Sequence, residues 1–221
     1  MTPEITFYFD FVSPYSYLAS TQLPYIASAT NAVIDWRPML LGEVFRATGN
    51  RPPGEVVAKG LYLWRDLIRF AERYGVELRL NPHFPVDTQS LMRAATGMKM
   101  FRPEELLFFV ESVFHAMWVE AKDIADPEVF ADVMFSVGLD PAEVNAWVSD
   151  PAIEEALDIE TEGAVARGVF GAPTFFVGDE MFFGQDRLDF VREASRLAAI
   201  SQCGVGAGAG AAVGRGGGGS F

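Results

Sequence analysis

Residues 5–16, ITFYFDFVSPYS, decide the fold because a strand there gives way to a helix within a few residues. The run 5–11 is rich in aromatic residues, which favours a buried strand. Ser13 is a favoured helix N-cap, and Pro14 suits the first helical position because its missing N–H would have no partner there. Residues 32–39, AVIDWRPM, predict a second strand, so the chain begins as β-α-β.

The C-terminal third returns to short strands. Residues 174–177 and 181–183 are β-rich runs on either side of Gly178-Asp179-Glu180, which is a hairpin signal. A helix is predicted before them, over 151–167, and residues 186–199 have the apolar spacing of an amphipathic helix after them. This part of the chain therefore predicts α-β-β-α.

Between these two ends the pattern is helical. Residues 59–74 place apolar side chains on one face, and Gly75 follows where a left-handed residue ends a helix. Three Asp-Pro pairs combine an N-cap with a proline at the first helical position: Asp126-Pro127, Asp140-Pro141 and Asp150-Pro151. We predict a two-layer α/β core made of residues 1–83 and 149–200, interrupted by an all-helical insertion domain over 84–148.

The charge balance narrows the range of partners. The chain has 221 residues and a formal net charge of −13, which repels phosphate backbones and anionic lipids. No apolar stretch reaches the ~20 residues that cross a bilayer. The first residues, MTPEITFYFD, lack the features of a signal peptide. We therefore expect a cytoplasmic protein without nucleic-acid or membrane partners, in which an anionic ligand needs a local cluster of cations.

Cysteine and histidine are scarce. The chain has one cysteine, Cys203, so it has no CxxC pair and no disulfide within the chain. Its two histidines, His83 and His115, are too few and too isolated for a metal site, so we expect no metal. The segment 201–221 is rich in Gly and Ala and is predicted to be a disordered tail that plays no part in the site.

Three stretches together resemble a known family: FDFVSPYSYLA near the N-terminus, TGNRPPG…AKGLYLWRD in the middle, and GVFGAPTFFVGDEMFFGQDRLDF towards the end. Residues 5–197 resemble the 2-hydroxychromene-2-carboxylate isomerases, which are relatives of the kappa-class glutathione transferases and of the periplasmic disulfide oxidoreductases. The resemblance implies a thioredoxin-like core with a helical insertion, glutathione as coenzyme and a homodimer.

Ser13 is the candidate catalytic residue. The resemblance places a cysteine here in the disulfide oxidoreductases, whereas a serine hydroxyl cannot act as a redox nucleophile. The hydroxyl can instead donate a hydrogen bond to a thiolate brought in by glutathione, beside the partial positive charge of a helix N-terminus. Lowering a thiol pKa from about 8.5 by about two units corresponds to roughly 2.7 kcal/mol. The alternative is that Ser13 only caps the helix, which is worth about 1 kcal/mol.

Four residues of the C-terminal third are candidate glutathione contacts by the same resemblance. It implies a cis peptide bond at Pro173 and pairing of the Ala172 backbone with the cysteinyl part of glutathione. It also implies that Gln185 and Asp186 form a turn for the γ-glutamyl end, where Asp186 can pair with the α-ammonium. The alternatives are a trans proline that begins a strand and an aspartate that caps the last helix.

Further candidates are cationic or aromatic. The resemblance places Asn50 and Lys59 near glutathione or the carboxylate of the substrate, although Lys59 also fits a solvated helix side chain. Arg37 is another cation that a carboxylate can use. The aromatic residues near the site in sequence can wall a flat aromatic substrate, or can equally belong to the core: Phe11, Tyr15 and Trp64.

The expected activity is the glutathione-dependent interconversion of 2-hydroxychromene-2-carboxylate and trans-o-hydroxybenzylidenepyruvate, or of a related aromatic carboxylate in hydrocarbon catabolism. Covalent addition of the thiolate would split one difficult step into two, without net redox change. A kappa-like glutathione transferase or peroxidase is the alternative enzyme. A non-catalytic binding domain on the same fold is the alternative of another class.

Overall fold

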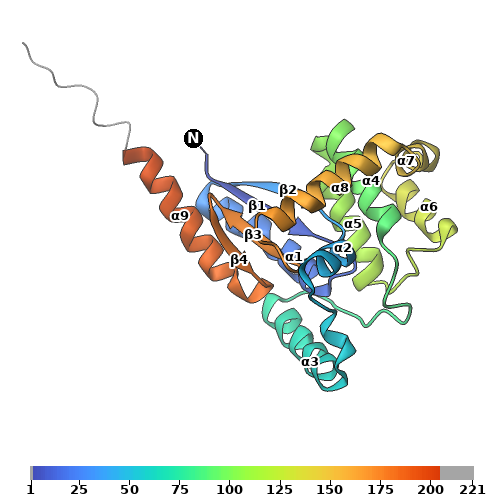
Figure 1. Cartoon of the computed structure of the whole chain (residues 1–221), viewed down its shortest axis with the longest axis horizontal. Helices are drawn as coiled ribbons and strands as arrows, with labels where there is room; N and C mark the ends of the chain where they lie inside the picture. The colour runs from blue at the N-terminus through green and yellow to red at the C-terminus, as the bar shows by residue number, and fades with distance from the viewer. Residues whose placement is uncertain (1, 205–221) are drawn as a thin grey trace, which may run out of the picture.

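The computed structural model describes residues 2–204 and contains one four-stranded sheet (Figure 1). Its strands are β1 (Glu4–Phe9), β2 (Val33–Pro38), β3 (Thr174–Val177) and β4 (Glu180–Phe183), in the order β2-β1-β3-β4. β1 runs parallel to β2 and antiparallel to β3, and β3 and β4 form a hairpin. The four predicted strand segments therefore do share one sheet, and the fold is thioredoxin-like with a helical insertion.

The helices in chain order are α1 (Pro14–Thr30), α2 (Leu41–Thr48), α3 (Val57–Tyr74), α4 (Gln89–Phe101), α5 (Leu106–Trp118), α6 (Pro127–Ser136), α7 (Pro141–Val148), α8 (Pro151–Ala166) and α9 (Leu188–Gly204), with short 3₁₀ turns η1 (Pro53–Glu55), η2 (Pro103–Glu105) and η3 (Gln185–Arg187). Within the described residues, no helix has the length and hydropathy that a membrane span needs.

Local sequence signals set the helix ends as predicted. Asp126, Asp140 and Asp150 each accept hydrogen bonds from first-turn N–H groups, and a proline follows each of them at the first helical position. α3 ends at Gly75, whose φ of 67° lies in the left-handed region that glycine adopts without strain. These caps fix the lengths of helices that are otherwise held by packing.

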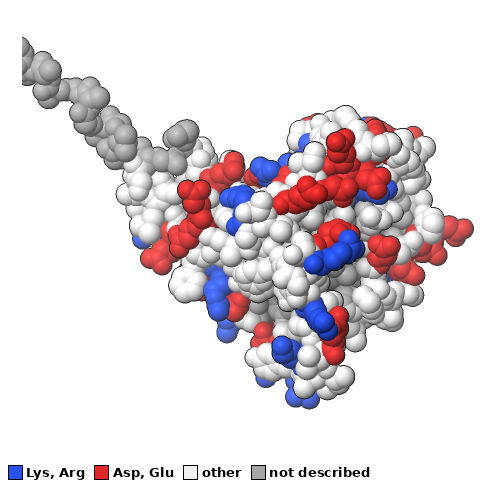
Figure 2. All heavy atoms as spheres, in the orientation of Figure 1, with Lys and Arg blue, Asp and Glu red and all other residues white. Residues whose placement is uncertain are grey.

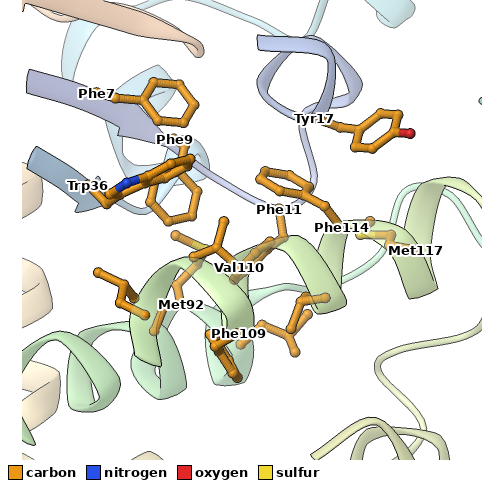
Figure 3. Close-up of a cluster of buried hydrophobic side chains, with 14 of the residues drawn as sticks. Phe7, Phe9, Phe11, Tyr17, Trp36, Met92, Phe109, Val110, Phe114 and Met117 are labelled. Atoms are coloured by element: carbon orange, nitrogen blue, oxygen red, sulfur yellow. The ribbon is translucent and has the colours of Figure 1, made fainter. Parts of the chain in front are cut away.

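The two faces of the sheet bury different side chains because alternate residues of a strand point in opposite directions. Phe7 and Phe9 of β1 point to the face that α1, α5 and α9 cover, where Phe114 of α5 packs against Phe9 (Figure 3). Phe175 of β3 stacks on Phe7 in the same core. Tyr8 points to the other face and packs with residues of α2 and α8. The helical insertion thus packs on the same aromatic core as the sheet.

The clearest differences from the predicted boundaries lie at the end of β1 and at both ends of α9. β1 ends at Phe9, not at residue 11, because the chain turns at Asp10 to let the Ser13 N–H reach the Asp10 carbonyl at 3.0 Å. The last helix begins at Leu188 after the 3₁₀ turn 185–187, and Ser201–Gly204 continue it although the prediction assigned them to the tail. The rest of the predicted tail, 205–221, lies outside the described residues.

Candidate active site

Ser13 lies at the start of α1 and acts as its N-cap, as predicted. Its Oγ accepts the N–H of Ser16 at 3.1 Å and donates to the carbonyl oxygen of Ala172 at 3.3 Å. Pro14 has no N–H, and within the described residues the N–H of Tyr15 has no hydrogen-bond partner. The start of α1 therefore offers one hydroxyl and one free amide, beside the positive end of a 17-residue helix.

Ala172 and Pro173 face Ser13 from the other end of the sequence. The Ala172–Pro173 bond is cis, as the resemblance implied. Ser13 is only 5% exposed and Pro173 is buried, whereas Ala172 is half-buried, so the edge of this contact reaches the surface. Two segments separated by 159 residues in sequence are thus joined by one hydrogen bond at the predicted reacting position.

Asp10 fixes the turn that presents Ser13. Its carboxylate is 3% exposed and accepts the N–H of Val12 at 3.0 Å, the N–H of Leu41 at 2.9 Å and the hydroxyl of Thr88 at 2.6 Å. Burial raises the pKa of Asp10, while these three hydrogen bonds act in the opposite direction. One carboxylate therefore joins the β1–α1 turn, the start of α2 and the segment before α4.

The helical insertion contributes a second support for this turn. The indole N–H of Trp118, at the end of α5, donates to the carbonyl oxygen of Phe11 at 2.9 Å. Trp118 is 1% exposed, so this hydrogen bond is shielded from water. Sequence reasoning missed both Asp10 and Trp118. An acidic residue inside the aromatic run ITFYFDF was the one signal available for Asp10.

Gln185 and Asp186 form the turn η3 between β4 and α9. Gln185 is 2% exposed and accepts hydrogen bonds from the hydroxyl of Tyr74, at 2.7 Å to its Oε1 and 3.3 Å to its carbonyl oxygen. Asp186 is exposed and pairs with Arg187 at 2.6 Å. Its side chain does not cap α9, because the 3₁₀ turn separates the two. The carboxylate therefore faces solvent beside a turn that α3 holds in place.

Asn50 follows α2, and Lys59 lies at the start of α3. The Asn50 amide donates to the carbonyl oxygen of Phe170 at 2.8 Å and so joins the end of α2 to the segment before the cis peptide bond. Lys59 is an exposed residue in the first turn of α3 and makes no ion pair within the described residues. The structure brings Asn50 to the Ala172 segment, whereas no contact joins Lys59 to it.

The predicted substrate residues separate into two groups. Tyr15 and Trp64 are half-buried, and the Tyr15 hydroxyl donates a long 3.4 Å hydrogen bond to the carbonyl oxygen of Leu63 in α3. Burial raises the pKa of Tyr15, and the charges of Asp66 and Asp186 add to the shift, so the phenol stays protonated. These two aromatic side chains can line a site beside Ser13.

Phe11 and Arg37 are placed elsewhere. Phe11 is 0% exposed and packs between Phe109 and Phe114 in the core, which leaves it no surface to offer to a substrate (Figure 3). Arg37 forms ion pairs with Asp35 and, at 2.8 Å, with Glu160 of α8, so its charge is already balanced. The structure does not support a substrate-binding role for either residue.

Comparison with known proteins places this geometry in a family. The model of the DSBA-like thioredoxin domain matches residues 4–196. A 2-hydroxychromene-2-carboxylate isomerase from Sphingobium xenophagum is 38% identical over 194 residues, which cover 86% of this chain and 97% of that protein. Glutathione S-transferase kappa 1 from Homo sapiens is 26% identical over 203 residues, which cover 85% of this chain and 88% of that protein.

A solved structure agrees with these matches. The structure of a 2-hydroxychromene-2-carboxylate isomerase superimposes with a TM-score of 0.83 at 30% identity, covering 91% of this chain and 98% of that one. Sequence and fold are therefore alike over nearly the whole length of the relatives. The chain belongs to the DSBA-like thioredoxin-domain family and is a homologue of the 2-hydroxychromene-2-carboxylate isomerases.

Proposed function

We propose that this protein is a glutathione-dependent isomerase that interconverts 2-hydroxychromene-2-carboxylate and trans-o-hydroxybenzylidenepyruvate, or a close relative of this aromatic pair. The observation that carries the proposal is the 3.3 Å hydrogen bond between the Ser13 hydroxyl and the Ala172 carbonyl, at the start of α1. Relatives at 38% and 30% identity bear the name of this isomerase, and the kappa relative bears the name of a glutathione enzyme.

The residues at this contact fit a thiol-containing peptide. At 3.3 Å the hydrogen bond from Ser13 to Ala172 is long for an O–H···O bond, so the hydroxyl can turn away at little cost. The same turn would free the Ala172 carbonyl to accept a peptide N–H. A free amide of Tyr15 and the α1 N-terminus complete a setting that favours a thiolate over a thiol.

Glutathione, when bound, would supply a thiolate nucleophile, and residues of the chain would bind the coenzyme and orient the substrate. Ser13 would donate a hydrogen bond to the sulfur, and the Ala172 backbone would hold the cysteinyl unit. Gln185 and Asp186 would take the γ-glutamyl end, with Asp186 pairing with its ammonium. Tyr15 and Trp64 would orient a flat aromatic substrate and exclude water from one side of it.

The name of the kappa relative suggests an alternative function to test: transfer of glutathione to an electrophile, or reduction of a peroxide. An isomerase returns its coenzyme unchanged, whereas a transferase releases a conjugate and a peroxidase releases glutathione disulfide. Product analysis therefore separates the three activities. We also propose a homodimer, which sedimentation or light scattering at several protein concentrations would detect.

The decisive assay follows the absorbance change of 2-hydroxychromene-2-carboxylate with the enzyme, with and without glutathione. We expect turnover only with glutathione, and full recovery of reduced glutathione at the end. Turnover without any thiol would overturn the coenzyme role. Stoichiometric consumption of glutathione would point instead to the transferase, and binding without turnover to a non-catalytic domain.

A further inference from the structure

Ser16, in the first turn of α1, has a buried hydroxyl that the proposed function does not use. Among residues 2–204, its Oγ is the one buried side-chain nitrogen or oxygen atom without a hydrogen-bond partner. Ser16 is 0% exposed, so bulk water does not reach the hydroxyl either. A buried hydroxyl without a partner lowers stability, because it has lost its hydrogen bonds to water and gained none in return. This unpaired group therefore needs a physical explanation.

Ser20 shows what a buried serine of the same helix does elsewhere. It lies four residues further along α1, is 3% exposed, and donates to the carbonyl oxygen of Tyr17 at 2.8 Å. Hydroxyls inside helices commonly bond to a carbonyl three or four residues back in this way. Four residues before Ser16 is Val12, which precedes the N-cap Ser13, so its carbonyl is not aligned with the helix axis. The first turn of α1 thus lacks the acceptor that Ser20 uses.

The backbone of Ser16 already contacts the proposed catalytic hydroxyl. Its N–H donates to the Oγ of Ser13 at 3.1 Å. In two of the three staggered rotamers of a serine, the hydroxyl oxygen is gauche to its own backbone nitrogen. Rotation about one bond therefore brings the Ser16 hydroxyl to the side of its N–H, where the Ser13 Oγ lies. That oxygen has two lone pairs and accepts one hydrogen bond from Ser16, so it can accept a second.

A thiolate at this position needs strong donors because the protein is acidic. Figure 2 shows acidic side chains spread over the face of the molecule that it views, and the formal net charge is −13. A field of like charge disfavours an added anion and raises the pKa of a thiol. The Ser13 hydroxyl must therefore be a stronger donor here than in a neutral protein. A second hydrogen bond to its oxygen would make it one, because hydrogen bonds in a chain polarise one another.

We propose that Ser16 is a positioning residue that acts through Ser13: when the Ser13 hydroxyl turns from Ala172 to the glutathione thiolate, the Ser16 hydroxyl donates to the Ser13 Oγ behind it. The inference rests on the proposed function, because it uses the same thiolate. Both serines keep their protons, and the thiol proton leaves to solvent water. The result is a row of two donors, Ser16 to Ser13 and Ser13 to sulfur.

The cost of the unpaired hydroxyl explains why this arrangement favours ionisation. In the free protein the Ser13 hydroxyl donates to Ala172 and the Ser16 hydroxyl has no partner. When a thiolate attracts the Ser13 O–H, the lone pairs of that oxygen turn with it, and Ser16 gains an acceptor. The new hydrogen bond exists only in the thiolate complex, so it stabilises that state and not the free protein.

Other ionisable groups surround the start of α1, and the test must hold them constant. Asp10 lies in the turn below it, and Tyr15 follows on α1 itself. The charges of Asp66 in α3 and Asp186 in η3 act on Tyr15. The segment 171–174, Gly-Ala-Pro-Thr, adds no ionisable side chain. All four groups remain in place when a buried serine of α1 is replaced by alanine, so a difference between two such variants reports on the serine.

The test titrates the thiolate absorbance of bound glutathione in the native protein, Ser16→Ala and the matched control Ser20→Ala. We expect Ser16→Ala to raise the pKa of the bound thiol by about 0.5–1, which lowers the thiolate population about three- to tenfold at low pH. Isomerase turnover should fall by the same factor there and recover as the pH rises above the new value. Ser20→Ala should leave the titration unchanged, because the Ser20 hydroxyl already bonds to Tyr17.

Thermal unfolding of the free proteins gives a second readout. Ser16→Ala removes an unpaired buried group and should raise the midpoint by about 2–8 °C, whereas Ser20→Ala removes a hydrogen bond and should not raise it. A positioning role thus predicts a more stable protein with a weaker thiolate site. Loss of the fold predicts both losses together.

Two further arms locate the effect at Ser13 and at the thiolate. Adding Ser16→Ala to Ser13→Ala should leave the pKa of the bound thiol where Ser13→Ala alone puts it, because Ser16 acts only through the Ser13 oxygen. S-methylglutathione has no ionisable thiol, so it should bind the native protein and Ser16→Ala with equal affinity.

Four results would contradict the inference. An unshifted titration in Ser16→Ala, beside a shift in Ser13→Ala, would overturn it and leave the proposed function standing. A further shift when Ser16→Ala is added to Ser13→Ala would overturn it as well, since Ser16 would then act without Ser13. A Ser16→Ala protein less stable than the native one would show that the hydroxyl has a partner already. No glutathione binding by the native protein, with thermal unfolding still cooperative, would refute the proposed function and this inference with it.

Discussion

Tyr74→Phe removes one oxygen from the contact that holds the turn 185–187 against α3. That oxygen lies 2.7 Å from Oε1 and 3.3 Å from the carbonyl oxygen of Gln185, which is 2% exposed. Without it, a buried amide oxygen loses its donor, and such a loss costs about 1–3 kcal/mol. We expect the free energy of unfolding to fall by this amount, and glutathione affinity to fall by up to about tenfold as the turn loosens.

The matched control is Tyr15→Phe, which removes a hydroxyl that reaches α3 from α1. Its hydroxyl lies 3.4 Å from the carbonyl oxygen of Leu63, which already accepts a hydrogen bond within α3, so little is lost. We expect a change in unfolding free energy below about 0.5 kcal/mol. Urea denaturation of the native protein and both variants, with equal slopes, gives the comparison.

The ionisation of the two phenols does not complicate this comparison. Burial raises the pKa of Tyr74 to about 12, and the pKa of Tyr15 is also raised by burial, so both hydroxyls stay protonated between pH 6 and 9. The difference between the two variants should therefore be constant over this range. A Tyr74→Phe protein as stable as Tyr15→Phe would refute the role given to the Tyr74–Gln185 contact.

Three further predictions concern the scaffold of the site. Thr88→Val removes the hydroxyl that donates to the Asp10 carboxylate at 2.6 Å, so urea denaturation should show an unfolding free energy lower by about 1.5–3 kcal/mol. A Thr88→Val protein as stable as the native protein would contradict this role of Thr88. Gly171→Ala places a methyl group 2.8 Å from the Phe183 ring and should destabilise the protein by about 1–3 kcal/mol. Gly163→Ala in α8 has no atom within 4 Å of the new methyl group and should stabilise the protein by about 0.5–1 kcal/mol, and calorimetry measures both changes. Burial raises the pKa of Asp10, so its contribution to folding is fully present below the ordinary pKa of about 3.9 and is lost as the pH rises through the raised value. A ¹³C titration of the Asp10 carboxyl should have its midpoint above about 3.9, and a midpoint below it would show that the hydrogen bonds outweigh burial.

The sequence allowed most of the fold to be predicted, because its signals are local. The Ser13-Pro14 start of α1, the three Asp-Pro caps and the glycine after α3 act through hydrogen bonds within one turn, and all occur in the structure. The end of β1 was misplaced because aromatic residues continue to Phe11, although the strand pairing stops at Phe9. A residue of the turn thus carries a core side chain.

The site was less predictable because its supports join distant segments. Hydrogen bonds join Asp10 to Thr88, Trp118 to Phe11 and Tyr74 to Gln185. No spacing in the sequence predicts these three pairs. Arg37 was predicted as a cation for the substrate carboxylate, but in the structure its charge is balanced by ion pairs with Asp35 and Glu160. The residues assigned by resemblance, Ser13 and Ala172, were found in contact because the family pattern already contains that long-range pairing.

The central claim is that the Ser13 hydroxyl stabilises the thiolate of bound glutathione. The direct measurement is a pH titration of thiolate absorbance for glutathione bound to the native protein and to Ser13→Ala. In the native complex we expect a thiol pKa about two units below the ordinary value of about 8.5, and in Ser13→Ala a clear return towards it. Isomerase turnover should fall by about ten- to a thousandfold, while the unfolding free energy falls by no more than about 1 kcal/mol. An unshifted thiol titration with full activity in Ser13→Ala would contradict the claim and leave Ser13 as a helix cap alone.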